Sequence, residues 1–254
     1  MDLGLHGRTA LVTGASKGIG RATADLLAAE GCDVWMVART SADLTAAAEA
    51  IASERGTKVT PIAADLSRSD EVDRVWHAVP TPDIVVNNAG AIPSGTIADV
   101  DEERWREAWD LKVFGYINLM RHAMAAMSER GSGVIVNVIG GGGEKPTPGY
   151  IAGAGGNAAL MAITRALGST STRRGVRVVG INPGLIHTER LEALMRSAAD
   201  RRFNDPDRWH ELLDQRYPPG HVDHIAAAVA FLASDRSANT TGTIVSIDGG
   251  ASAR

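Results

Sequence analysis

The feature that most constrains the fold is a glycine-rich segment near the N-terminus, Thr13–Gly20, which follows the short apolar run Thr9–Val12 and leads directly into a helical pattern. This order of a strand, a glycine turn and the first turn of a helix predicts an anion-binding turn. Gly14 would take backbone angles closed to other residues, Gly18 would let main chain approach a diphosphate, and Gly20 would let the helix pack closely on the strand. The helix N-terminus would then face the anion. Ordinary tight turns use the same glycine spacing, so the assignment depends on the rest of the chain.

Short β-branched runs alternate with longer helical patterns, which predicts a parallel sheet covered on both faces. The predicted strands are Thr9–Thr13, Val34–Ala38, Lys58–Ala63, Ile84–Asn87, Val134–Val138, Arg177–Asn182 and Thr243–Ile247. Helical and β segments are not segregated, and the chain has no internal repeat or low-complexity linker. We therefore expect one doubly wound α/β domain over residues 1–254. Two stretches are predicted to be irregular, Gly140–Gly149 and Arg196–Pro219, and loops at strand ends bind ligands in such folds.

Composition excludes several classes of partner. The formal charge of −4 is spread along the chain without a basic tract suited to nucleic acid or an anionic membrane. No apolar run approaches about 18 residues, and the N-terminus lacks the pattern of a secretion signal. The single Cys32 excludes an internal disulfide, and no spacing matches a set of metal ligands. We expect a cytoplasmic protein with no metal site.

The end of the second predicted strand bears on the cofactor. A site selecting NAD usually places an acidic residue there to bond the adenosine ribose, and Val37–Ser41 contains none. Arg39 together with Lys17 instead offers two cations where the extra phosphate of NADP would lie. The alternative is that both are solvated surface cations. Their joint placement favours NADP(H) as the cofactor.

Two further segments follow predicted strands. Asp65–Leu66 comes after the third strand and Asn87–Gly90 after the fourth. Both fit simple turn chemistry, and both also fit hydrogen bonding to the adenine and ribose side of a dinucleotide.

Taken in order, these segments resemble the short-chain dehydrogenase/reductase family. The resemblance runs from about Leu5 to Gly250 and rests on Thr13–Gly20, Asp65, Asn87–Gly90, Asn182–Gly184 with Thr188, and Ile247–Gly250. It implies a Rossmann-type seven-stranded parallel sheet, a nicotinamide cofactor, a small-molecule substrate and a homotetramer built on the helices around Trp105–Met127 and Asn157–Thr172. The cofactor-binding residues that it implies are Gly14, Ser16, Lys17, Gly18, Ile19, Gly20, Arg39, Asp65, Leu66, Asn88, Ala89, Gly90, Pro183, Gly184 and Thr188.

The catalytic positions implied by the resemblance are all changed. The family uses a Tyr that transfers the proton, a Lys four residues later, a Ser and a supporting Asn. The match of Asn157–Leu167 to the family helix that begins with this Lys places the Lys on Asn157 and the Tyr on Gly153. The Ser then falls on Gly140 and the Asn on Lys112.

Substitute groups lie near these positions. Tyr150 precedes Gly153 by three residues and is either a proton donor or an aromatic of the pocket wall. In a helix its side chain would lean away from the site, whereas an extended loop before it leaves the geometry open. His187, between Gly184 and Thr188, is a second candidate acid, or an exposed polar residue.

Compared with the family pattern, the amine and the amide have changed places. The family has Asn at the position of Lys112 and Lys at the position of Asn157. Lys112 would reach the cavity as a desolvated cation, or would extend to solvent or bond backbone carbonyls. Gly140 and Gly153 would leave the cavity larger.

Three functions remain open. The first is an NADP(H)-dependent oxidoreductase acting on a carbonyl or alcohol with an atypical site. The second is a non-redox lyase or isomerase, and the third is a catalytically silent NADP-binding subunit or sensor.

Overall fold

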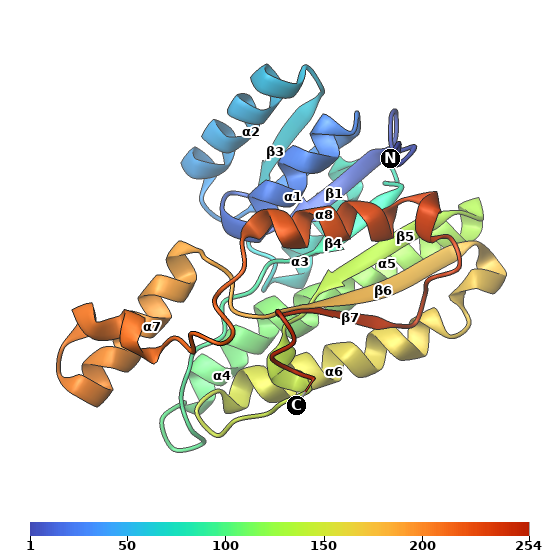
Figure 1. The fold of residues 1–254 in the computed structure, drawn as a ribbon. Coiled ribbons are helices and arrows are strands. Elements are labelled where there is room, and N and C mark those ends of the chain that lie inside the picture. Colours follow the sequence, from blue (N-terminus) through green and yellow to red (C-terminus); the bar gives the residue numbers. More distant parts are fainter. Residues whose placement is uncertain (254) are drawn as a thin grey trace.

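A single sheet of seven parallel strands organises the chain, and the computed structural model describes residues 1–253 (Figure 1). The strand order is β3-β2-β1-β4-β5-β6-β7, as expected for the Rossmann-type doubly wound fold. The strands are β1 Thr9–Thr13, β2 Asp33–Ala38, β3 Val59–Ala63, β4 Ile84–Asn87, β5 Gly133–Val138, β6 Val176–Pro183 and β7 Ile244–Ile247. Each predicted strand is confirmed, with its ends within one residue of those expected.

Helices cover both faces of the sheet. One face carries α1 Gly18–Ala29, α2 Ser41–Arg55 and α8 Val222–Ala233, and the other carries α3 Ser69–Ala78, α4 Glu102–Trp109, α5 Gly115–Arg130 and α6 Ile151–Gly168. The central strands are therefore buried on both sides: in β2, Met36 belongs to one apolar cluster and Trp35 to the other. This arrangement explains why the strands are continuous apolar runs rather than alternating ones.

The predicted helix Trp105–Met127 contains an irregularity that its sequence did not indicate. A π-helical turn, Asp110–Phe114, joins α4 to α5 and carries Lys112 at its centre. Its neighbours Leu111 and Val113 are both buried. Turns of this kind often occur at functional sites, because they redirect a side chain without ending the helix.

The charged stretch Arg196–Pro219 is more regular than predicted. Helix α7, Glu189–Phe203, includes its first part, and a short 3-10 helix follows at Pro206–Leu212. The hydroxyl of Thr188 caps α7 by accepting from Leu191 N at 3.2 Å, and Glu192 pairs with Arg196 one turn later. These local interactions stabilise a polar helix that lies away from the sheet (Figure 1). Gly140–Gly149 is irregular as expected apart from the 3-10 turn Gly141–Gly143.

The topology places a crevice at the carboxyl ends of β1 and β4. These two strands are neighbours, with Val12 paired to Val86, and the chain leaves them toward opposite sides of the sheet. Loops from both halves separate at this point, which is where open α/β sheets bind ligands. Among residues 1–253, no helix combines the length and apolar character needed to cross a bilayer.

Candidate active site

A cleft of about 780 Å³ lies at the carboxyl ends of the central strands. It extends from Arg39, after β2, past the glycine turn to Lys112 and Tyr150. Every residue predicted to bind the cofactor lines it except Gly20 and Asp65. The structure therefore brings together segments that are far apart in the sequence, on one continuous surface.

The glycine turn has the geometry that the sequence predicts. Gly14 and Gly18 have φ angles of +63° and +58°, in the left-handed region that favours glycine. A β-carbon on Gly20 would lie 2.2 Å from the carbonyl oxygen of Gly14, so only glycine fits where the helix meets the strand. The Asn88 carboxamide nitrogen donates to the carbonyl oxygens of Thr13, at 3.0 Å, and Gly14, at 3.2 Å. This arrangement holds the turn open beside the N-terminus of α1, a suitable cradle for a diphosphate.

The two predicted phosphate ligands differ in their surroundings. Lys17 Nζ lies 3.1 Å from a carboxylate oxygen of Glu189, and both side chains are exposed. Arg39 is also exposed, and within residues 1–253 its guanidinium has no hydrogen-bond or ion-pair partner. Arg39 is thus free to bind an anion, whereas Lys17 already has a partner.

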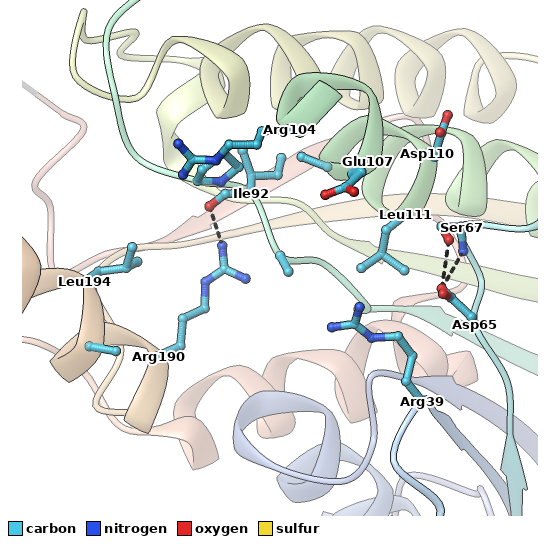
Figure 2. A pocket seen from close by; sticks show the side chains of 14 residues that line it. Arg39, Asp65, Ser67, Ile92, Arg104, Glu107, Asp110, Leu111, Arg190 and Leu194 are labelled. Carbon is cyan, nitrogen blue, oxygen red and sulfur yellow. Dashed lines mark hydrogen bonds between the residues drawn. The ribbon is translucent and has the colours of Figure 1, made fainter. Parts of the chain in front are cut away.

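Asp65 lies in a second cavity of about 670 Å³ next to the cleft, which Arg39 and Arg190 enter from opposite sides (Figure 2). One carboxylate oxygen of Asp65 accepts from the backbone nitrogen and the hydroxyl of Ser67, at 3.1 and 2.8 Å. Asp65 therefore forms a turn of its own loop, which was one of the two roles open to it.

Lys112 reaches the far end of the cleft. Its ammonium nitrogen donates to the carbonyl oxygens of Ile139, at 2.8 Å, and Val138, at 3.3 Å. Its stem crosses Gly90, where a β-carbon would lie 2.5 Å from the lysine Cδ. Burial, reinforced by the charge of Arg190, lowers the pKa of Lys112 to about 7. Lys112 thus both lines the cavity and bonds backbone carbonyls, two roles that the sequence offered as alternatives.

Tyr150 also lines the cleft, because it precedes α6 rather than belonging to it. Its backbone angles, φ −139° and ψ 39°, are not helical, so its side chain does not lean away from the site. A β-carbon on Gly153 would lie 2.1 Å from two carbons of the Tyr150 ring, and one on Gly142 would lie 3.1 Å from another. The expectation that Gly153 enlarges the cavity is therefore wrong, since the Tyr150 ring fills that space.

Arg190, in the first turn of α7, completes this end of the cleft. Its guanidinium donates to the carbonyl oxygens of Gly90 and, at 3.1 Å, of Ile92 (Figure 2). It also lies close enough to Tyr150 to act on the pKa of its hydroxyl. Burial raises the pKa of that hydroxyl, while the positive charge of Arg190 acts in the opposite direction. Sequence reasoning missed Arg190, because nothing but its position after Thr188 distinguishes it from the other arginines.

Comparison with known proteins identifies the family. A family model for short chain dehydrogenases matches residues 8–199. The chain belongs to the short chain dehydrogenase family. Its fold and glycine turn are those that this membership implies.

The relatives of this short chain dehydrogenase include sugar reductases. L-xylulose reductase of Mesocricetus auratus is 32% identical over 254 residues, with 98% of each chain covered. The crystal structure of L-sorbose reductase from Gluconobacter frateurii, complexed with NADPH and L-sorbose, is similar with a TM-score of 0.90 and 29% identity, covering 98% of both chains. An NAD⁺-bound xylitol dehydrogenase is similar with a TM-score of 0.88 and 25% identity, covering 97% of this chain and 99% of that one. The fold alone therefore does not distinguish the two nicotinamide cofactors.

Two candidate residues of this short chain dehydrogenase do not line the cleft. The side chain of Asn157 is only 2% exposed beneath the loop at Gly140, where a β-carbon would lie 3.0 Å from its amide nitrogen. Its carboxamide oxygen is buried and has no hydrogen-bond partner within the described residues. His187 is exposed, with its ring 5.5 Å from that of His221. The structure thus brings Lys112 and Tyr150 together but places His187 outside the cleft. Within residues 1–253, no group of three or more His, Cys, Asp or Glu residues is arranged to hold a metal ion.

Proposed function

We propose that this short chain dehydrogenase is an NADP(H)-dependent oxidoreductase that interconverts a carbonyl and an alcohol at a rebuilt catalytic centre. The observation that carries the proposal is the single cleft. It joins the glycine cradle and the free cation Arg39 to a polar end formed by Lys112, Tyr150 and Arg190. The NADPH complex of the similar L-sorbose reductase supports the choice of cofactor.

The residues of this chain fit the cofactor. Gly14 and Gly18 shape the cradle for the diphosphate, and the N-terminus of α1 faces it. Arg39 would bind the extra phosphate of NADP(H) with charge-assisted hydrogen bonds, and Lys17 would share its charge between that phosphate and Glu189. Asp43 lines the same end of the cleft and repels a phosphate, so Arg39 has to outweigh it.

The rebuilt centre replaces the family's catalytic set. We propose that Gly140, Gly153, Asn157 and Lys112 stand at the family's Ser, Tyr, Lys and Asn positions. The ring of Tyr150 fills the space beside Gly153, and its hydroxyl takes the role of proton donor. Burial keeps the phenol protonated at neutral pH, and the positive charge of Arg190 stabilises the phenolate left after proton transfer.

Carbonyl reduction requires a hydride from the cofactor and a proton from the protein. When bound, NADPH supplies the hydride for the carbonyl carbon. Tyr150 gives its proton to the carbonyl oxygen, which completes the alcohol. Lys112 anchors the end of β5 through the carbonyl oxygens of Val138 and Ile139 and adds a cation beside the reacting oxygen.

The first test is cofactor binding followed by turnover. Titration monitored by protein fluorescence should show tighter binding of NADPH than of NADH. With NADPH, reactive carbonyls such as quinones and α-diketones should be reduced, and simple ketones more slowly. Tight NADPH binding without any NADPH oxidation across the panel would instead favour the silent subunit or the non-redox enzyme.

The control is a variant in which the family's catalytic residues are restored. It combines four substitutions, Gly140→Ser, Gly153→Tyr, Asn157→Lys and Lys112→Asn. If only this variant reduces carbonyls, the natural site lacks reductase chemistry. If the natural protein is already active, the proposal stands.

We also propose that the protein is a homotetramer. Of the apolar residues on α5 and α6, Met120 and Leu160 lie in the core of their own chain, so they do not mark an interface. Phe114 is 51% exposed, and Ile117 and Ile163 are only partly buried, which leaves apolar surface for a second subunit. Light scattering at micromolar concentration should give the tetramer mass, and a monomer mass would contradict this.

A further inference from the structure

The end of the cleft that contains Tyr150 has two cationic side chains, Lys112 and Arg190, and neither forms an ion pair within the described residues. Lys112 and Arg190 both line the cleft there. Among the described residues that line it, the acidic ones are Asp43, on the first turn of α2, and Glu189, which pairs with Lys17. Arg190 also lines the neighbouring cavity, where Asp65, Glu107 and Asp110 are the acidic residues, but no ion pair joins it to them. Arg190 therefore keeps a charge that no carboxylate contacts directly.

One short loop, Gly90–Ile92, holds both cations. The stem of Lys112 packs on Gly90, and Arg190 donates to the carbonyl oxygens of Gly90 and Ile92. Tyr150 lines the same end of the cleft, near enough to Arg190 for the guanidinium charge to act on its hydroxyl. A guanidinium has more N–H groups than these bonds use, so donors remain for a ligand. Because the carbonyls fix its position, Arg190 is a preorganised anion-binding group beside the proposed proton donor.

We propose that the substrate carries a carboxylate next to the reacting carbonyl, as an α-keto acid does, and that Arg190 binds that carboxylate. This inference rests on the proposed function and names the substrate class of the same site. An α-keto acid places its carboxylate one bond from the carbonyl, so Arg190 can bind the carboxylate while Tyr150 reaches the carbonyl oxygen. The carboxylate also relieves the repulsion between Arg190 and Lys112, which contributes to the lowered pKa of that lysine.

The test compares matched substrates with NADPH: an α-keto acid, its methyl ester and an α-diketone of the same length. The ester and the diketone are intrinsically more electrophilic, so a preference for the acid reports recognition. We expect the wild-type kcat/KM to be at least about tenfold higher for the acid. Arg190→Gln should lower kcat/KM for all three compounds, because the phenolate of Tyr150 loses a nearby cation. The ratio of kcat/KM for the acid to that for the neutral compounds should fall by a further factor of about 10 to 100, and Arg190→Lys should recover part of that ratio.

Arg104→Gln is the matched control, because Arg104 lines the neighbouring cavity but not the cleft (Figure 2). It should leave the acid preference unchanged. Equal kcat/KM for acid and ester in the wild type, or equal losses on both in Arg190→Gln, would overturn the inference.

Failure of the proposed function gives a different result. If no carbonyl is reduced, calorimetry with the α-keto acid still tests recognition: binding that is lost in Arg190→Gln and kept in Arg104→Gln supports an anion site. Absence of binding to the wild type overturns it. Reduction of the diketone but not the acid would preserve the reductase and exclude the anionic substrate.

Discussion

The two ends of the cleft are built in different ways. At the glycine turn the surface is backbone, and its shape follows from residues close together in sequence, such as Gly14 and Gly18. At the other end the surface is side chains, and Lys112, Tyr150 and Arg190 come from three separate helical regions. A backbone cradle depends on local conformation, whereas a cluster of side chains depends on how distant elements pack. The comparison predicts that substitutions at the two ends affect different measurements, binding at one and turnover at the other.

Tyr150→Phe should give the largest effect. Loss of the proton donor should lower kcat by about 100- to 10,000-fold, the usual contribution of general acid catalysis. The Kd for NADPH should change little, because the cradle and Arg39 are untouched. Stopped-flow reduction of an α-diketone and fluorescence titration measure the two quantities. Tyr217→Phe, outside the cleft, is the control, and an unchanged kcat in Tyr150→Phe would assign the proton to another group.

Gly153→Ala should lower turnover without weakening cofactor binding, through a steric effect alone. The new methyl group would overlap the Tyr150 ring and displace it, so we expect kcat to fall by about tenfold or more with the Kd for NADPH retained. Gly155→Ala is the matched control on the same helix, because Gly155 is exposed and its β-carbon would meet the Trp109 ring at 3.3 Å, away from Tyr150. It should keep activity, because the crowded group is Trp109 and the Tyr150 ring is left in place. Equal activity of the two variants would contradict the placement of Tyr150.

Arg39→Ala tests the other end. Removing a free cation from the phosphate site should weaken NADPH binding by about tenfold and leave NADH binding nearly unchanged. Lys17→Ala should cost less, since Glu189 already shares the charge of Lys17. Titration of both cofactors with both variants measures this order. A similar loss of affinity for NADH would show that Arg39 does not bind the extra phosphate of NADPH.

The last comparison concerns stability, because burial of Lys112 should make the free energy of unfolding depend on pH. The folded-state pKa of Lys112, lowered to about 7 by burial, lies below the value of about 10.4 in an unfolded chain. Between these values the unfolded state binds more protons, so the free energy of unfolding should rise with pH from 7 toward 10.

Lys112→Met should reduce that rise, and the exposed Lys58→Met should not. Urea unfolding at pH 7 and pH 9 makes the measurement. The same slope in Lys112→Met as in the wild type would mean that the ammonium is not desolvated in the folded state.

The sequence alone determined the fold and one end of the cleft. Short β-branched runs located the seven strands, because buried parallel strands are continuous apolar runs bounded by turns. The glycine turn was predictable because the conformation of Gly14 and the close packing at Gly20 are demands on single residues. The order of strands and helices then fixed where the crevice lies.

Tertiary structure decided the other end. The sequence left Tyr150 open because its direction depends on whether α6 has begun, and the helix begins one residue later. His187 and Arg190 lie within three residues of each other, yet packing of α7 exposes His187 and turns Arg190 toward the Gly90 loop. A side chain's partner across the fold is set by the position of its whole element, and residue spacing along the chain does not contain that information.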